Sequence, residues 1–452
     1  MEARRIPRRS VVPALAAVAF VVAIAASGCA FDASAPAGDG SGSQPDDGPE
    51  DGGDDDTAAV CPESLHTVLT VNGRVAASAA TSPIVTVSLG DTVVLSAAGS
   101  CSQRGPVTFE WEIVDADLAA TADASTDSET LRVYPVLPGD YRVTLTVSDD
   151  AGSGEPVSII ALRAFPWVSL AEQDDVRDVA IGAGRIWMAT GDGAFFLDLA
   201  DLEAGVQAVN DGVPGPPDVS DNLSAVHFAG GDGVVWFARR GNAGQVWRVD
   251  ASSLAVNAIN LPVVVDVRDI AAAGPGVMVG GRDGVLQAPD NQSFGPPDPV
   301  EDVHAVAENA QSAWAGGQDL FRVGTAASIS PFGENDDKIR ALVGDGDRVW
   351  VGSDDQGIAR IDGTAVAAVY TQDDQLPTNK IRALTVDSAG DVWAATDKGV
   401  VRYKNDRDVW VTMDEAAGLD GLVDVFGVAV QETEGERLIV IGAGSGIGIL
   451  GL

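Results

Sequence analysis

A repeated pattern between Val176 and Leu452 constrains this 452-residue chain more than any other feature. Seven times the chain runs through a short apolar segment, a turn rich in Gly and Asp, a segment centred on a large apolar residue, and a segment that begins near Gly. Residues Ile381–Tyr403 hold the clearest copy. A unit of this size cannot bury its own apolar face, so it has to stack against further copies. The sequence therefore predicts a closed array of small β-sheets.

The spacing of the copies indicates the size of each unit. Aligning the centres of the second predicted strands gives Trp187, Trp236, Met278, Trp314, Trp350, Trp393 and Ile439. Their mean separation is about 42 residues, which fits four short strands per unit, the size of a propeller blade. In the clearest copy we expect strands at 381–386, 391–396, 399–403 and 409–413. We expect the tryptophans to pack between neighbouring sheets rather than to form a carbohydrate-stacking row.

The ends of the repeat region predict how the array closes. The last copy stops at residues 447–452 without an outermost strand, whereas Phe165–Leu170, ahead of the first copy, is similar to the outermost strand Val409–Met413. We therefore expect residues near 166–170 to complete the seventh unit, which removes exposed sheet edges. The predicted fold of residues 165–452 is a seven-bladed β-propeller within an all-β chain.

The first 29 residues are typical of an export signal. Four arginines precede an apolar run at residues 11–26, which is shorter than the roughly 20 residues of a membrane-spanning helix. Residues 26–29 read Ala-Ser-Gly-Cys and resemble a bacterial lipobox, which implies that Cys29 is lipidated and becomes the mature N-terminus. Ala30, by resemblance to Gram-negative sorting, implies the outer membrane. The alternatives are an uncleaved anchor and an ordinary secretory signal with an incidental cysteine.

Residues 30–60 and 61–164 differ in character from the repeats. The first segment consists almost entirely of Gly, Ser, Pro, Ala, Asp and Glu, so we predict a disordered tether. The second shows short alternating strands separated by turn residues, a pattern typical of a β-sandwich, with Trp111 in its core. The stretch Leu137–Gly152, together with Phe109–Trp111, resembles a PKD-type immunoglobulin-like domain. That resemblance implies a spacer or adhesion module.

Two cysteines remain after Cys29. Cys61 and Cys101 form an even pair in a chain predicted to be exported, where oxidation is permitted, so we expect a disulfide. Spacing alone leaves two unpaired thiols as the alternative.

The repeat also resembles a known family. Asp374–Ile381, which leads into the first strand of its copy, and Gly390–Thr396 after it are similar to the two-component-regulator propeller repeat. In that family, propellers often form extracytoplasmic sensor regions, so the resemblance implies a sensing or binding role outside the cytoplasm.

One position near the start of the first strand is basic in six copies. These candidate ligand-binding residues are Arg177, His227, Arg268, His304, Arg340 and Arg382. An equal register would place them at equal height around a central channel, as a basic mouth able to accept a carboxylate or sulfate. The alternative is that each arginine pairs with nearby carboxylates, among them Asp175 and Asp266.

Composition and missing motifs exclude several functions. The formal charge of -39, with no basic patch, argues against nucleic acid. The chain has three histidines and no zinc-protease motif, nucleophile elbow or phosphate-binding loop, so we predict no enzyme activity, no cofactor and no metal site. His227 and His304 keep open a propeller-based lyase or hydrolase acting on cell-surface polymers.

We therefore expect a lipid-anchored extracytoplasmic binding protein of the bacterial cell envelope, in the outer membrane. Its membrane partner is the lipid bilayer at Cys29, and its propeller binds an unknown protein, glycan or small anionic ligand. A passive structural scaffold of an envelope complex is a further alternative.

Overall fold

The computed structural model describes residues 61–451 with gaps. The gaps are residues 62–64, 73, 78–84, 88–89, 114–117, 121–126, 151–154, 165–166, 171–172, 210–221, 242–244, 263–265, 290–292, 297, 299, 301, 326, 334–338, 418, 420, 423 and 434–435. The predicted signal segment with Cys29 and the predicted tether lie outside the described residues. In the described part the elements are β-strands, with two short 3-10 helices, η1 (Leu202–Ala204) and η2 (Glu415–Ala417). No helix there is long and apolar enough to cross a membrane. The predicted all-β class is confirmed for this part of the chain.

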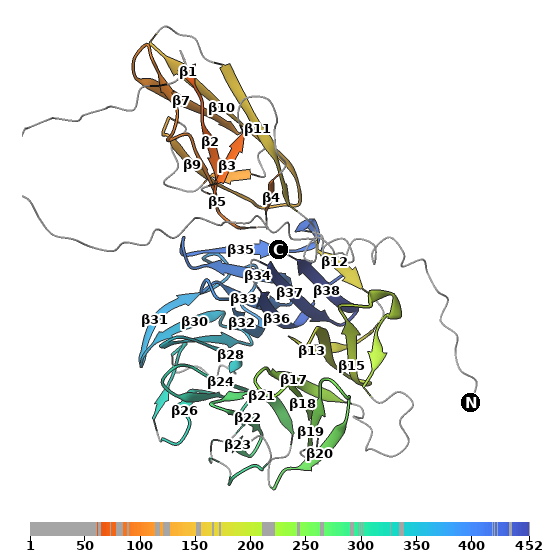
Figure 1. The fold of residues 1–452 in the computed structure, drawn as a ribbon. Coiled ribbons are helices and arrows are strands. Elements are labelled where there is room, and N and C mark those ends of the chain that lie inside the picture. The colour runs from red at the N-terminus through yellow and green to blue at the C-terminus, as the bar shows by residue number, and fades with distance from the viewer. Residues whose placement is uncertain are drawn as a thin grey trace, which may run out of the picture.

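Residues 61–164, called the N-terminal unit below, form two main sheets (Figure 1). One has the order β4 (Val85–Val87), β11 (Glu155–Ala164), β10 (Gly139–Asp149) and β7 (Val107–Ile113). The other has the order β3 (Arg74–Ala77), β2 (Leu69–Val71), β5 (Val93–Ser96), β9 (Thr130–Pro135) and β8 (Leu118–Ala120). A further pair joins β1 (Leu65–His66) to β6 (Cys101–Ser102).

The two main sheets of the N-terminal unit share one apolar core. Leu95 and Leu131 from one sheet and Trp111 and Val143 from the other belong to a single cluster, and each is at most 3% exposed. Trp111 donates its indole N–H to the carbonyl of Ser128 at 2.8 Å, which satisfies its one polar atom inside the core. At the edge of the unit, Cys61 and Cys101 are joined in a disulfide.

Seven further sheets, called I to VII below, follow in chain order. Their strands are β13 (Val176–Gly182), β14 (Arg185–Thr190), β15 (Gly193–Asp198) and β16 (Gln207–Ala208) in sheet I; β17 (Leu223–Ala229), β18 (Val234–Arg239), β19 (Gln245–Asp250) and β20 (Val256–Asn260) in sheet II; β21 (Val267–Ala273), β22 (Gly276–Gly281) and β23 (Gly284–Ala288) in sheet III; and β24 (Ala305–Glu308), β25 (Ala313–Gly316), β26 (Leu320–Arg322) and β27 (Ser328–Ile329) in sheet IV. Sheet V contains β28 (Ile339–Asp345), β29 (Arg348–Ser353), β30 (Ile358–Asp362) and β31 (Ala365–Tyr370); sheet VI contains β32 (Ile381–Val386), β33 (Val392–Thr396), β34 (Gly399–Lys404) and β35 (Val409–Met413); and sheet VII contains β36 (Val425–Thr433), β37 (Glu436–Ala443), β38 (Gly446–Gly451) and β12 (Val168–Leu170).

The strands of sheet VI match the prediction for the clearest copy to within one residue. The seven aligned large residues also lie at the centres of the second strands, and none is more than 4% exposed. Trp187 of sheet I shares a cluster with Val235 and Phe237 of sheet II, so it packs between sheets as predicted. Burial this complete leaves no tryptophan face for a sugar.

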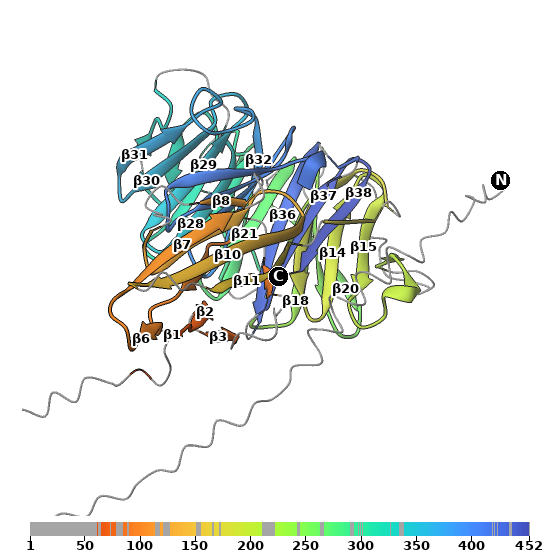
Figure 2. The ribbon, with the colours of Figure 1, turned by 90° about the horizontal axis from the view of Figure 1, so that it is seen from above.

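The sheets form a ring around the strands that come first in each sheet (Figure 1). Each first strand contacts the first strand of the next sheet, and β36 of sheet VII contacts β13 of sheet I. Figure 2 shows the strands of sheets VII and I standing side by side. Gly442 makes this approach possible, because a Cβ at that position would lie 2.7 Å from the Cγ1 atom of Val176. The ring therefore closes by face-to-face packing, while no described sheet closes on itself.

The outermost strand of sheet VII comes from the start of the ring segment. β12 pairs antiparallel with β38, which places Leu170 opposite Ile447 and Val168 opposite Ile449. Leu170 is 3% exposed and joins the apolar cluster between sheets VII and I. This pairing is the closure that residues near 166–170 were predicted to provide.

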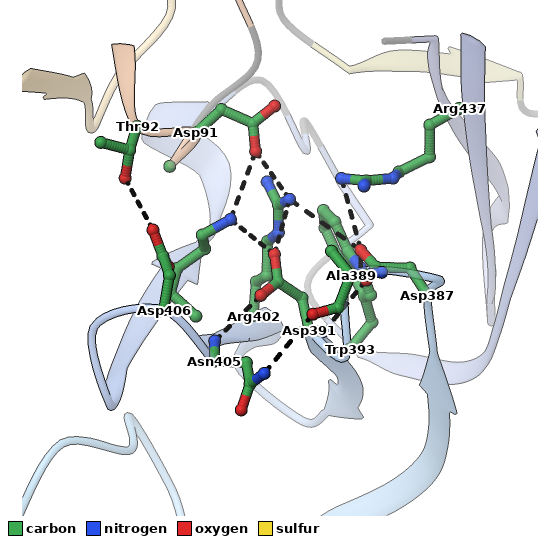
Figure 3. A network of polar contacts seen from close by, with 12 residues as sticks. Asp91, Thr92, Asp387, Ala389, Asp391, Trp393, Arg402, Asn405, Asp406 and Arg437 are labelled. Atoms are coloured by element: carbon green, nitrogen blue, oxygen red, sulfur yellow. Dashed lines mark hydrogen bonds and ion pairs between the residues drawn. The ribbon is translucent and has the colours of Figure 1, made fainter. Parts of the chain in front are cut away.

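The N-terminal unit contacts sheet VI through a network of charged side chains (Figure 3). Asp91, just before β5, accepts contacts from Arg402 at 2.7 Å and from Lys404 at 3.4 Å. Both cations also pair with Asp391 of the ring, at 2.9 Å and 2.5 Å. Arg402 is fully buried and stacks over Trp393 at 4.6 Å. The network thus links residues more than 300 positions apart in the sequence.

Candidate functional site

A cavity of about 480 Å³ lies at the centre of the ring and is lined by residues from the first strand of every sheet. Its volume falls in the range of small-ligand sites. The lining residues include all six candidates from the sequence. The first strands therefore bring together six candidates that are up to 205 positions apart in the chain.

A β-bulge near the start of the first strand positions the side chains at one end of this cavity. In sheet I, Val176 pairs with Thr190 and Asp178 pairs with Ala189, so Arg177 is the extra residue between them. Five other first strands shift register in the same way. A bulge re-aims the side chain of its extra residue.

In sheet IV the equivalent residue is His304. It lies three residues before the strand partner of Trp314, just as Arg177 in sheet I lies three residues before the strand partner of Trp187. The six bulge residues and His304, together called the rim below, are Arg177, Ser224, Arg268, His304, Arg340, Arg382 and Phe426.

His227 was wrongly placed in this register by the sequence analysis. It pairs with Trp236, three residues beyond the rim residue Ser224, and it lines the cavity at a deeper level. The error came from the turn between β17 and β18, which has two more residues than the turn between β13 and β14. Burial lowers the pKa of His227 to about 4, so this imidazole is neutral at pH 7.

Sequence reasoning also missed Ser224 and Phe426, although a signal for both exists. Each rim residue stands second in a four-residue motif that starts and ends with an aliphatic residue and has Asp, Ala or Gly at its third position. The motifs are Val176–Val179, Leu223–Val226, Val267–Ile270, Val303–Val306, Ile339–Leu342, Ile381–Leu384 and Val425–Val428. The first residue of every motif is fully buried, which fixes the register of the bulge that follows.

The rim arginines are paired with carboxylates. Arg177 contacts Asp175 at 2.7 Å, Arg268 contacts Asp266 at 3.1 Å and Asp302 at 2.9 Å, Arg340 contacts Asp354 at 3.2 Å, and Arg382 contacts Asp424 at 2.8 Å. The pairs with Asp175 and Asp266 are those that the sequence alternative named. Part of the positive charge is therefore neutralised at the rim itself.

Four side chains around the rim come from residues with a left-handed backbone. Asp175, Asn222, Asp266 and Asp302 each lie two residues before a rim residue, and their φ angles run from 52° to 66°. Asp and Asn adopt this conformation more readily than other residues that have a Cβ. It directs these side chains at the guanidinium groups, as when Asn222 accepts from Arg177 at 2.7 Å.

His304 joins two of the arginines. The Nδ1 atom of His304 lies 2.7 Å from Nη1 of Arg340 and 2.9 Å from Nη1 of Arg268, and the Nε2 atom of His304 lies 3.4 Å from Asp302. Burial first, and then the charges of Arg268 and Arg340, lower the pKa of His304 to about 4. A neutral ring protonated at Nε2 satisfies these contacts, because Nδ1 is then an acceptor. His304 therefore acts at neutral pH as a bridge between cations and is a poor general base.

Arg240 lies immediately after β18 and adds a positive charge. In the described part of the chain no group forms a hydrogen bond or an ion pair with its side chain. Desolvation and the charges of Arg177, Arg268 and Arg340 lower its pKa, against an opposing effect of Asp266. A cation whose ionisation is opposed by three neighbouring cations lies in a positive local potential. A positive potential stabilises an anion that binds near Arg240.

One residue deeper than the rim, the cavity contains two carboxyl groups. Asp178 accepts from the backbone amides of Val179 at 2.9 Å and of Val226 at 2.8 Å. Asp269 accepts from the amides of Ile270 and Val306, both at 2.8 Å. Burial raises the pKa of each carboxyl to about 7, which the amide hydrogen bonds only partly offset. Each of these side chains bridges the first strands of two neighbouring sheets.

The described residues contain no group of three or more His, Cys, Asp or Glu side chains arranged for a metal ion. They offer an arginine rim, a neutral histidine bridge and amide-bound carboxyls, which together suit binding of a charged group more than bond cleavage.

Comparison with known proteins adds one family match and several fold likenesses. Residues 375–398, within sheet VI, match the model of the two component regulator propeller. No curated protein matches the chain. A two-component-regulator propeller repeat is therefore present where the sequence analysis expected it.

Several solved structures are similar to this chain at low sequence identity. The extracellular domain of the putative one component system BT4673 from B. thetaiotaomicron is 14% identical with a TM-score of 0.45, and the match covers 63% of this chain and 39% of that one. The WD40 beta propeller domain of Doa1 is 13% identical with a TM-score of 0.47 over 63% of this chain and 95% of that one. YCF48 bound to D1 peptide is 14% identical with a TM-score of 0.46 over 63% and 96%. This chain thus spans about two fifths of the BT4673 structure.

Proposed function

We propose that residues 165–452 form a seven-bladed β-propeller that binds an anionic group of its ligand at the arginine rim. The observation that carries this proposal is the side chain of Arg240, which has no hydrogen-bond or ion-pair partner among the described residues and whose charge is opposed by those of Arg177, Arg268 and Arg340, three residues of the rim. Guanidinium groups suit carboxylate and sulfate because their N–H donors match two oxygens at once. The ligand class is therefore a carboxylate- or sulfate-bearing small molecule, glycan or protein segment.

The rest of the chain fits a binding protein of the cell envelope. In this proposal residues 1–29 are a lipoprotein signal that ends at the lipidated Cys29, residues 30–60 are a tether, and residues 61–164 are a PKD-like spacer or adhesion module. The disulfide between Cys61 and Cys101 supports an oxidising compartment. Mass spectrometry of the mature N-terminus tests the anchor, and an unmodified Cys29 or cleavage elsewhere would remove it.

Anion titration tests the rim directly. Acetate and sulfate, each titrated by calorimetry at constant ionic strength, are expected to bind saturably to the wild-type protein. Arg240→Gln and Arg382→Gln should each weaken that binding about tenfold, since each removes a charged donor. Arg348→Gln is the matched control. Arg348 is the first residue of β29, at the end of that strand away from the rim and beside the hairpin turn, and 41% of its side chain is exposed. Equal binding by all four proteins, or no saturable binding by the wild type, would refute the rim as a site.

A lyase or hydrolase is the second candidate, and one contact favours it. His304 lines the cavity and lies beside Asp302, as an acid/base histidine would. Its lowered pKa and its two arginine neighbours count against a general base at neutral pH. Turnover of acidic cell-surface polysaccharide by the wild type, abolished in His304→Gln, would replace binding by catalysis as the function.

A further inference from the structure

The first strand of each sheet leaves a row of backbone amides facing the cavity, because no further strand pairs with that edge. In sheets I and II these amides are bound by Asp178, which bridges Val179 and Val226. In sheets III and IV they are bound by Asp269, in the same way. Each carboxyl stands at the third position of its motif and accepts one amide hydrogen bond from its own sheet and one from the next sheet.

The series breaks at sheet V. The third position of its motif is Ala341, whose side chain ends at Cβ and offers no acceptor. Among the described residues no side chain accepts from the amides of Leu342 in sheet V or Leu384 in sheet VI. Two neighbouring amides at the level of Asp178 and Asp269 are therefore left without the carboxyl that their counterparts have.

The register shows that these amides point into the cavity. Leu342 pairs with Val351, next to the pair of Val343 with Trp350. Val179 holds the same place in sheet I, since it pairs with Met188 next to the pair of Ala180 with Trp187. Amide direction alternates along an antiparallel pair, so residues at equal register direct their N–H groups alike. Leu384 has the same register in sheet VI.

The rim residue of sheet VI also has a donor without a partner. The Nη1 atom of Arg382 is buried and has no hydrogen-bond partner among the described residues. Arg340, the rim residue of sheet V, directs one nitrogen at His304 and another at Asp354. The guanidinium group of Arg382 pairs with Asp424 and lies 4.2 Å from the ring centre of Phe426, so it extends toward sheet VII and its free donor belongs to the rim beside the two amides.

We propose that the amides of Leu342 and Leu384 bind a carboxylate of the ligand, in the arrangement that Asp178 and Asp269 have in the other sheets. The proposal rests on the proposed function, in which the rim admits an anion, and it names the group and the atoms. The two carboxylate oxygens would accept one amide each, as the two oxygens of Asp178 do. A carboxylate on a narrow, unbranched stem is the class that reaches this level, because the Asp side chain that fills it elsewhere is such a stem.

A titration of the wild-type protein tests this without any variant. With the leucine amides labelled by ¹⁵N, acetate is added at constant ionic strength and followed by NMR. The amides of Leu342 and Leu384 are expected to shift together and to saturate with one dissociation constant, while chloride gives no such shift. Saturable binding of acetate that leaves both amides unshifted would overturn the proposal.

Ala341→Asp places the missing carboxyl on the protein itself. The variant is expected to show the acetate-bound shifts of Leu342 and Leu384 without acetate and to bind acetate at least about tenfold more weakly. Ala225→Asp is the matched control, because it adds a charge at the same level of sheet II, where Asp178 already binds the amide of Val226. It should weaken acetate binding less and leave the two leucine amides unchanged.

The outcomes separate the two proposals. If Arg240→Gln abolishes acetate binding while folded Ala341→Asp binds acetate like the wild type, the anion stays at the rim and the amide site is refuted alone. If neither acetate nor sulfate binds the wild type, both proposals fail. Equal effects of Ala341→Asp and Ala225→Asp would reduce the site to general repulsion and refute it as well.

Discussion

The contact between the N-terminal unit and sheet VI supports a prediction whose size can be worked out. Asp91→Asn keeps the shape of the side chain and removes its negative charge. Arg402 and Lys404 then each lose an ion pair, at 2.7 Å and 3.4 Å, and both side chains are at most 8% exposed. Both cations would keep Asp391, and Arg402 would also keep Asp387 at 4.0 Å.

The expected cost follows from burial and from the partner that remains. A hydrogen bond to a charged group contributes about 1.5–3 kcal/mol, so two of them set an upper figure of about 6 kcal/mol. The Asp91 side chain is 34% exposed, and Asp391 continues to pair with both cations, so most of that figure is not lost. We expect Asp91→Asn to lower the free energy of unfolding by about 2 kcal/mol and the Tm by about 2–3 °C.

Urea denaturation and scanning calorimetry measure this change. Asp406→Asn is the matched control, because Asp406 also reaches the N-terminal unit, by accepting from Thr92 at 3.1 Å, but is 51% exposed. An exposed contact is worth less than about 1 kcal/mol. A double-mutant cycle of Asp91→Asn with Lys404→Met should give a coupling energy of about 1 kcal/mol. Equal costs for Asp91→Asn and Asp406→Asn, or no coupling, would show that the N-terminal unit does not sit against sheet VI in this way.

Two further predictions concern the ring. Leu170→Ala should cost about 2–5 kcal/mol of stability by urea denaturation, because Leu170 of β12 is 3% exposed in the cluster that joins sheets VII and I; a cost below about 1 kcal/mol would show that β12 does not close the ring. Between pH 5 and 6.5 the stability of the wild type should be nearly flat, since the raised pKa values of Asp178 and Asp269 make stability fall with rising pH, while the lowered pKa values of His227 and His304 make it rise. Replacing both aspartates by Asn leaves the histidines unopposed, so the stability of the double variant should increase over that range by about 1 kcal/mol per pH unit or more, and an unchanged flat profile would refute the raised pKa values.

The strands and their packing could be predicted because they depend on local chemistry. The copy at Ile381–Tyr403 separates short apolar runs, such as Val392–Ala395, by turn residues and places Gly399 where the chain turns, with φ at 105°. Short apolar runs bounded by turn residues are typical of buried strands joined by hairpins. The large residue of each second strand was recognised for the same reason, since burial of that position repeats in every sheet.

The site was predicted only in part, because it depends on register. Arg177, Arg268, Arg340 and Arg382 were found because each lies ten or eleven residues before a tryptophan or its equivalent. His227 was misplaced because counting back from Trp236 ignored a longer turn. Arg240 was not found at all, since it lies after a second strand and the sequence analysis considered only the first strands.

The four-residue motif explains why the bulge governs this site. Its first residue is fully buried in every sheet, as Ile339 and Ile381 are, and its last is an aliphatic residue at the level of the amides. A slip of one residue in a strand turns every side chain to the other face, so the extra residue of the bulge is what lets a polar rim stand between two apolar positions. The third position is then confined to a small residue or to an Asp that folds back onto the amides. The choice of Ala341 over Asp at that position therefore decides whether the protein binds its own amides or leaves them to a ligand.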